Sequence, residues 1–130
     1  MSYVPDSAEA VRAFLEAEDI ARRASHAPSS AHLLLALFTF PNRAQVLLSE
    51  RGIDEERILR EIRVIEDEPR RTLGRLRDRA REIARGSGAE NVDCLHVLIA
   101  LTRLRDAFAY RLLERTGTSL TALRNVAVSY

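Results

Sequence analysis

Two stretches of the sequence decide the fold: HLLLAL at residues 32–37 and HVLIAL at residues 96–101. A second pair of matching segments, LLSERGID at 47–54 and LLERTGTS at 112–119, has almost the same spacing. Self-similarity at a constant spacing is typical of a chain that repeats one structural unit. The sequence therefore predicts two copies of a single unit in tandem.

Caps and breakers around the first stretch divide the chain into four expected helices. The first begins at the capping pair Asp6-Ser7 and ends before Pro28. The other three are helix 32–38 behind Ser29-Ser30, helix 43–51 with Gly52 as its C′ residue, and a helix capped by Asp54 with Ile58, Leu59, Ile62 and Ile65 as its apolar stripe.

A charged joint, Glu66-Asp67-Glu68-Pro69-Arg70-Arg71, separates the copies, and its proline marks it as a linker. The second copy then has the same order of elements. Its expected helices are residues 70–85, residues 94–101 capped by Asp93, residues 107–115 ending at Gly117, and a last helix behind Ser119.

The pattern predicts an all-α fold of eight helices, arranged as two four-helix repeats related by a pseudo-twofold axis. Four helices of this size bury their apolar faces poorly alone, so the repeats should pack together. We expect one domain over residues 1–130, with repeat 1 at about 6–65, the linker at about 66–70 and repeat 2 at about 71–128.

The composition is that of a folded helical protein. Of the 130 residues, 46% are apolar and 30% are charged, which excludes global disorder. The net charge of +1 excludes a polybasic or polyacidic binder, although all 20 basic residues are arginine. No apolar run approaches the ~18 residues of a membrane span, and the first residues carry no secretion signal. We expect a cytoplasmic protein without membrane contact.

The repeated motif resembles the N-terminal double-repeat domain of Clp AAA+ unfoldases of the ClpA and ClpC type. That family's repeat has Glu-His before an apolar helix, then paired leucines and a glycine. The resemblance covers about residues 6–128 and rests on Ala31-His32, Leu47-Leu48 and Gly52-Ile53-Asp54 in the first copy, and on Leu95-His96, Leu112-Leu113 and Gly117 in the second.

The resemblance implies a protein-interaction domain that docks adaptors of the ClpS or MecA kind, or protein substrates, for a Clp-type unfoldase and protease in protein quality control. The ATPase phosphate-binding loop needs a lysine, and this sequence has none. An excised N-terminal domain and a stand-alone protein of the same fold both stay open. We expect no enzymatic activity and no cofactor.

In the ClpC branch, the resemblance implies that the Glu before each His contacts arginine-phosphate marks on substrates. Ala31 and Leu95 stand at these two positions here, and neither pairs with a guanidinium group. Ser7 replaces a threonine that assists at the first helix start, while Arg70 lies near the corresponding place in the second copy. We therefore expect no phosphoarginine recognition.

The histidines His32 and His96 occupy equivalent positions at the start of the two apolar helices. They form either a paired metal or acid–base site, or hydrogen bonds that hold the loop before each helix. No cysteine or carboxylate accompanies them at metal-ligand spacing, which favours the structural role and no metal. We expect structural roles for Gly52 and Gly117 too. We interpret Cys94 as a core residue, because no base accompanies it that could activate its thiol as a nucleophile.

Seven arginines crowd the helix over 70–85, and Arg71, Arg75 and Arg79 follow one face. This face is either solvated or a site for an acidic protein partner or nucleic acid. No aromatic residue accompanies the arginines, which argues against nucleic acid as the partner. The solvated interpretation predicts neutralising pairs within the helix: Asp78–Arg81, Asp78–Arg75 and Glu82–Arg85.

Aromatic residues flank the break after each apolar helix, with Phe38 and Phe40 in the first copy and Phe108 and Tyr110 in the second. Such residues either form a peptide-docking surface or plug the core, and both interpretations stay open. The candidate partner-binding residues are Ser7, Phe38, Phe40, Arg71, Arg75 and Arg79. The alternative function is a stand-alone regulatory protein that binds an acidic partner or nucleic acid through the arginine-rich helix.

Overall fold

Helices account for most of residues 3–130, which are the part of the chain that this computed structural model describes. Within that part, the only β-type pairing is an isolated parallel bridge between Asp6 and Val92, so the predicted all-α class is confirmed. The eight helices are α1 (Ala8–Arg23), α2 (Ser30–Ala36), α3 (Arg43–Glu50), α4 (Glu55–Glu61), α5 (Thr72–Gly86), α6 (Cys94–Leu101), α7 (Phe108–Arg115) and α8 (Leu120–Ser129).

Short polar side chains start several of these helices, as the sequence indicates. Ser7 Oγ accepts the Ala10 N–H at 3.1 Å, and Asp54 Oδ1 accepts the Arg57 N–H at 2.8 Å. Asn42, which the sequence shows only as part of a break, caps α3 in the same way. These bonds satisfy backbone donors that have no partner inside the helix.

Two predicted boundaries beside the linker are wrong, and α2 spans Ser30–Ala36 instead of residues 32–38. Helix α4 ends at Glu61, so Ile62 and Ile65 lie beyond it, and Leu59 is 48% exposed instead of part of an apolar stripe. Helix α5 begins at Thr72 and not at residue 70, because Arg71 adopts a left-handed conformation with φ of 63°. Both differences lie beside the linker, where the chain turns from one repeat to the other.

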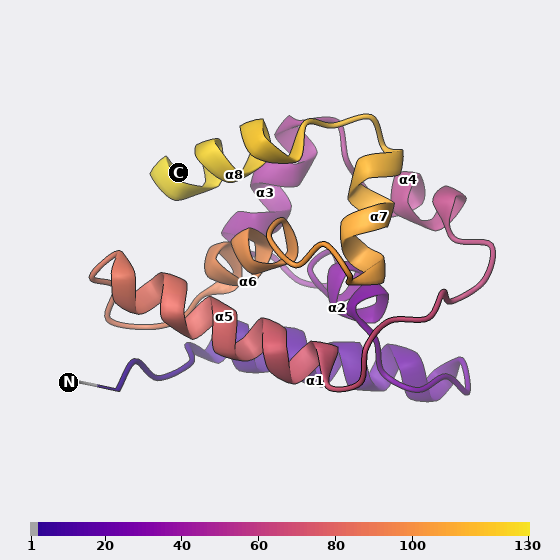
Figure 1. The fold of residues 1–130 in the computed structure, drawn as a ribbon, viewed down its shortest axis with the longest axis horizontal. Helices are drawn as coiled ribbons and strands as arrows, with labels where there is room; N and C mark the ends of the chain where they lie inside the picture. Colours follow the sequence, from indigo (N-terminus) through magenta and orange to yellow (C-terminus); the bar gives the residue numbers. More distant parts are fainter. Residues whose placement is uncertain (1–2) are drawn as a thin grey trace.

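The two apolar helices, α2 and α6, lie at the centre of the molecule (Figure 1). Helix α1 packs on α2, and α5 packs on α6. Across the repeats, α7 packs on α2 while α3 packs on α6, and this reciprocity is what a pseudo-twofold relation requires. The eight-helix, two-repeat architecture predicted from the sequence is therefore the observed one.

One hydrophobic cluster runs through both repeats. Leu34 of α2, Leu98 of α6 and Phe108 of α7 are completely buried within it. The apolar stretches that define the repeat thus supply the centre of a shared core. Among the described residues, no helix combines the length and apolar character needed to cross a membrane.

The segment before α1 is bound to the second repeat. The Ser7 N–H donates to the Val92 carbonyl and the Val92 N–H donates to the Pro5 carbonyl, each at 2.8 Å. Arg81 of α5 donates to the Val4 carbonyl at 3.1 Å and to the Asp6 carboxylate at 2.8 Å. The start of the first repeat is therefore held by α5 and by the loop before α6.

Candidate functional site

The two histidines complete capping boxes at the start of α2 and α6. His32 Nδ1 accepts the N–H of Ser29 at 3.0 Å, and His96 Nδ1 accepts the N–H of Asp93 at 2.9 Å. Ser29 and Asp93 are the N-cap residues of the two helices. Each imidazole thus holds the loop before its own helix, in the manner of the Glu or Gln of an ordinary capping box.

Burial, above all, lowers the pKa of both histidines. The neighbouring His26 lowers the pKa of His32 further, whereas Glu68 raises it. For His96, the Asp93 carboxylate raises the pKa and Arg43 lowers it. His32 Nε2 lies 3.2 Å from Nδ1 of His26, an exposed residue of the loop between α1 and α2. No cluster of three or more metal-ligating side chains occurs among residues 3–130.

The carboxylate positions of the resembled family are apolar and buried here. Ala31 is completely buried and Leu95 is 5% exposed. Ser7 uses its side chain to cap α1, so its hydroxyl is already engaged within the fold. These residues place no carboxylate where a guanidinium group would need one.

Cys94 is buried at the first position of α6. Burial, with smaller effects of the Glu9 and Asp93 carboxylates, raises the pKa of its thiol to about 12. Its Sγ lies 3.6 Å from the carbonyl oxygen of Glu9, within reach of a weak hydrogen bond. A thiol with these properties is not activated for nucleophilic attack.

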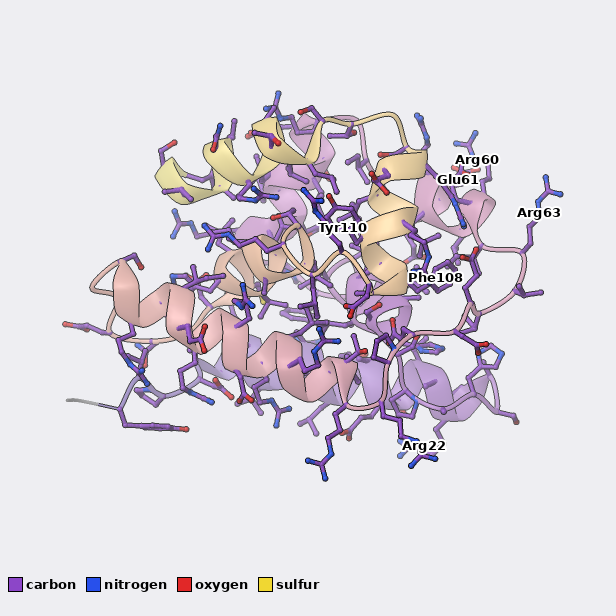
Figure 2. All side chains as sticks on the ribbon, in the orientation of Figure 1. Arg22, Arg60, Glu61, Arg63, Phe108 and Tyr110 are labelled. Carbon is purple, nitrogen blue, oxygen red and sulfur yellow. The ribbon has the colours of Figure 1, made fainter. Side chains whose placement is uncertain are left out.

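The aromatic candidates divide between core and partly covered positions. Phe40 is 5% exposed, and the Arg12 guanidinium lies 4.6 Å from the centre of its ring. Phe40 therefore packs in the core and presents little of its ring to a partner. Phe38 is only partly buried, as is Tyr110, whereas Phe108 is completely buried at the start of α7 (Figure 2).

The arginines of α5 are held largely by groups outside the helix. Arg75 donates to both oxygens of Asp106 at 3.2 Å, and the Arg77 guanidinium lies 4.3 Å from the ring centre of Phe14. Three ion pairs predicted within the helix do not occur in the described part of the chain: Asp78–Arg81, Asp78–Arg75 and Glu82–Arg85. Arg79 and Glu82 instead form an ion pair of 3.7 Å within the helix.

The predicted arginine face is consequently less continuous than its spacing indicates. Arg71 precedes α5 in a left-handed conformation, and the Arg75 charge is offset by Asp106. Arginines extend into solvent elsewhere too: Arg60 and Arg63 point away from the body of the molecule near the end of α4 (Figure 2). The positive charge is therefore spread over several faces.

Sequence reasoning missed Glu68, which joins the two repeats. Its Oε2 accepts the Ser30 N–H at 2.9 Å, and its Oε1 accepts the Phe108 N–H at 2.9 Å. The Ser30 hydroxyl also donates to Glu68 and accepts the Ala109 N–H. One linker carboxylate thus binds the first turns of both α2 and α7. A proline directly after a run of acids marks the linker but does not reveal these distant partners.

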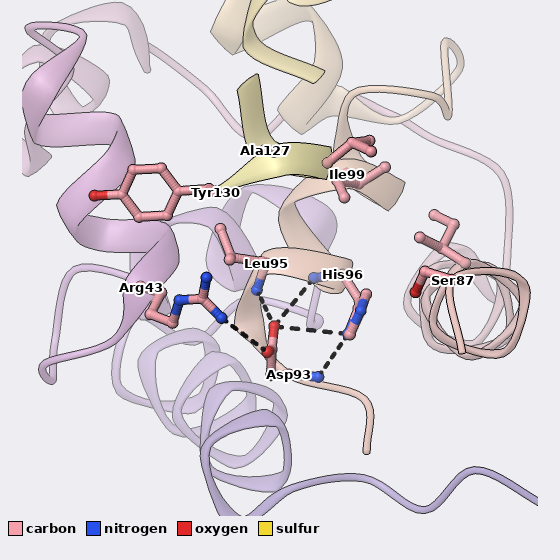
Figure 3. Close-up of a pocket in the computed structure, with 10 residues that line it drawn as sticks. Arg43, Ser87, Asp93, Leu95, His96, Ile99, Ala127 and Tyr130 are labelled. Carbon is pink, nitrogen blue, oxygen red and sulfur yellow. Dashed lines mark hydrogen bonds and ion pairs between the residues drawn. The ribbon is translucent and has the colours of Figure 1, made fainter. Parts of the chain in front are cut away.

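A small hollow lies at the start of α6, between α3 and the end of α8 (Figure 3). Arg43, Asp93 and His96 stand on one side of it, with Arg43 Nη1 at 4.0 Å from Asp93 Oδ2. Leu95 and Ile99 supply apolar surface. The hollow encloses about 140 Å³, less than the ~300–1,000 Å³ of typical small-molecule pockets.

Gly52 and Gly117 end α3 and α7 at equivalent positions, with φ of 76° and 82°. The Gly52 N–H bonds to the Ser49 carbonyl and the Ile53 N–H to the Leu48 carbonyl, which is the Schellman pattern. A residue with a β-carbon is strained at such a φ.

These features define a helical double-repeat domain built on two histidine-capped apolar helices. The structure is similar to the crystal structure of the N-terminal domain of the caseinolytic protease associated chaperone ClpD from Arabidopsis thaliana, with a TM-score of 0.78 and 22% identity over 95% of each chain. No protein-family model and no curated protein matches the sequence. The chain therefore has the fold of a Clp N-terminal domain, as the repeated motif predicts.

Proposed function

We propose that this chain is a protein-interaction domain that docks adaptors or protein substrates for a Clp-type AAA+ unfoldase. The similarity of the whole fold to the ClpD N-terminal domain carries the proposal, because it extends over 95% of both chains. The domain receives its protein partners at its surface, in the cytoplasm, and takes part in protein quality control.

The domain has no enzymatic activity in this proposal. Three observations support that part: the Cys94 thiol is buried with a raised pKa, and His32 and His96 each use Nδ1 to cap a helix. A general base needs a lone pair directed at the reacting proton, and these lone pairs are directed at backbone N–H groups.

A chimaeric unfoldase tests the proposal. The chain is fused in place of the native N-terminal domain of a ClpC-type ATPase, and degradation of an adaptor-dependent substrate is measured with the partner protease. We expect faster degradation than with the ATPase lacking any N-terminal domain. Equal rates, with the fused domain shown by circular dichroism to be folded, would contradict the proposal.

Binding of nucleic acid through α5 is the competing function. Three phosphate contacts by Arg71, Arg75 and Arg79 would give a slope of log K against log salt of roughly −2 to −3. Fluorescence anisotropy with labelled DNA and RNA at about 50 and 200 mM salt measures that slope. We expect weak binding at the lower salt only. Sub-micromolar affinity at the higher salt, lost on changing the three arginines to alanine, would favour the competing function instead.

A further inference from the structure

A groove crosses the second repeat between the C-terminal halves of α5 and α8. The hollow at the start of α6 and a second hollow further along α5 share Ile83, Ser87 and Val128, so the two are continuous. We call this the second-repeat groove. Its apolar lining is Ile83, Leu95, Ile99, Ala127 and Val128.

Apolar surface in this groove is open to solvent at its mouth. Val128 is 64% exposed on α8, and Ile83 is partly buried on α5, while Ile99 between them is 3% exposed. Covering exposed aliphatic groups of this kind is favourable in water. The groove therefore has room and affinity for an aliphatic side chain from another molecule.

Cationic groups outnumber acidic ones along the groove. Arg43 stands at the α3 end, and Arg79 and Arg103 stand at the other, against Asp93 and Glu82. Asp93 already accepts the Leu95 N–H at 2.7 Å. The Arg103 guanidinium has no hydrogen bond or ion pair with any residue in 3–130. Arg43 lies 4.0 Å from Asp93, and Arg79 lies 3.7 Å from Glu82. Arg103 is therefore the surplus charge, and it favours an occupant that carries carboxylates.

The first repeat shows what covers the corresponding place there. Glu68 binds the first residues of α2 and α7, Ser30 and Phe108. The counterparts in the second repeat are the first residues of α6 and α3, Cys94 and Arg43. In the first repeat the linker residues Ile65 to Glu68 lie around the same hollow as Ser29, the N-cap of α2, whereas Arg43 and the residues flanking Cys94 border the open groove.

We propose that the second-repeat groove binds an acidic segment of a partner protein, an extended stretch with an aliphatic side chain followed by carboxylates. The aliphatic side chain packs between Ile83 and Val128, and the carboxylates face the guanidinium groups of the groove. The inference rests on the proposed function, because it assigns a docking surface and a class of partner sequence to this domain.

A labelled peptide tests the inference directly. The probe is a fluorescein-labelled Val-Ile-Glu-Asp-Glu-Pro peptide, which copies the linker sequence, and the matched probe is Val-Ile-Gln-Asn-Gln-Pro. Anisotropy is measured with the full chain. We expect saturable binding of the acidic peptide and at least about tenfold weaker binding of the neutral one, a difference of about 1.4 kcal/mol.

Variants locate the binding surface. Val128→Asp and Arg103→Glu should each weaken binding of the acidic peptide at least about tenfold. Val64→Asp and Arg63→Glu are the matched controls, since Val64 is 67% exposed in the first repeat, and they should leave binding unchanged. All four positions are exposed, and thermal unfolding of each variant verifies that it folds.

Several results would overturn the inference. They are an absence of saturation by about 1 mM peptide, equal binding of the two peptides, or binding that Val128→Asp and Arg103→Glu leave intact. An oligonucleotide whose binding depends on the same two residues would assign the groove to nucleic acid instead. The peptide assay contains no ATPase, so its failure is distinguishable from failure of the chimaeric unfoldase.

Discussion

His32 and His96 give the stability of the fold a dependence on pH. Each accepts a backbone N–H at Nδ1, so protonation of that atom breaks the capping box. Burial is the main reason that the pKa of each histidine lies below the ordinary value of 6.5. The unfolded chain therefore binds protons at a higher pH than the folded chain, and stability present above pH 6.5 is lost as the pH falls below it.

We expect the free energy of unfolding to fall as the pH is lowered from about 7.5 to about 5. The double variant His32→Gln and His96→Gln keeps an acceptor at both capping boxes but removes the titrating group. Its free energy of unfolding should change less over this range. Urea unfolding at several pH values measures both proteins, and parallel profiles would show that the two histidines do not carry the effect.

Phosphoarginine should bind weakly or not at all. Ala31 and Leu95 are buried apolar residues where the resembled family has carboxylates, so nothing at these positions pairs with the guanidinium part of the ligand. Titration calorimetry with free phosphoarginine measures this. Low-micromolar affinity at two sites per chain would contradict the prediction.

At the scale of the helices, α2 and α6 supply the buried centre of the core. Leu34→Ala and Leu98→Ala should each cost about 2–5 kcal/mol of the free energy of unfolding, because both side chains are completely buried. Val64→Ala, at an exposed position, should cost less than about 0.5 kcal/mol. Chemical denaturation compares the three variants, and losses below about 1 kcal/mol at both leucines would rule out the central position of these helices.

The linker carboxylate joins α2 to α7, and its removal should weaken both helix starts. Glu68→Ala leaves the Ser30 and Phe108 N–H groups without their acceptor, at an expected cost of about 1–3 kcal/mol. Asp67→Ala is the matched control, because Asp67 is exposed and its carboxylate has no hydrogen bond or ion pair within residues 3–130; its backbone carbonyl, which the substitution keeps, accepts from Arg111. Equal stabilities of the two variants by chemical denaturation would show that the Glu68 bonds contribute nothing.

Sequence patterns predict the start of a helix correctly where the contacts that fix it come from neighbouring residues. Ser7, Asp54, Asp93 and Ser119 cap the helices that follow them, since a cap acts within three residues. The early end of α4 is different. Glu66 binds Arg111 at 3.2 Å and Arg115 at 2.7 Å, and these arginines lie more than 40 residues further along the chain. No periodicity in the α4 sequence reports such partners.

At the scale of the whole molecule, the two repeats share one core. Leu34 and Leu98, one from each repeat, belong to the same buried cluster, so neither repeat has a complete core alone. We expect thermal unfolding to be a single transition, with equal calorimetric and van't Hoff enthalpies. Differential scanning calorimetry measures both enthalpies. Two well-separated transitions would mean that the repeats unfold independently.

The surface was harder to predict than the core. The repeat places His32 and His96 correctly at the helix starts, because the same sequence recurs around both. The prediction of an arginine face along α5 is less accurate, because residues of other elements contact three of its arginines. These contacts are Asp106 with Arg75, Phe14 with Arg77 and Asp6 with Arg81. No pattern in the sequence indicates the second-repeat groove, because the residues that line it come from four separate helices, α3, α5, α6 and α8.

The attachment of the segment before α1 has a consequence for the order of folding. Its partners are distant along the chain: Arg81 lies 77 residues from Val4 and 75 from Asp6. Neighbouring helices such as α1 and α2 can collapse early, since closing a short loop costs little entropy. The segment before α1 can bond to Arg81 and Val92 only after the second repeat has formed. The segment before α1 is therefore among the last parts of the domain to take its native position.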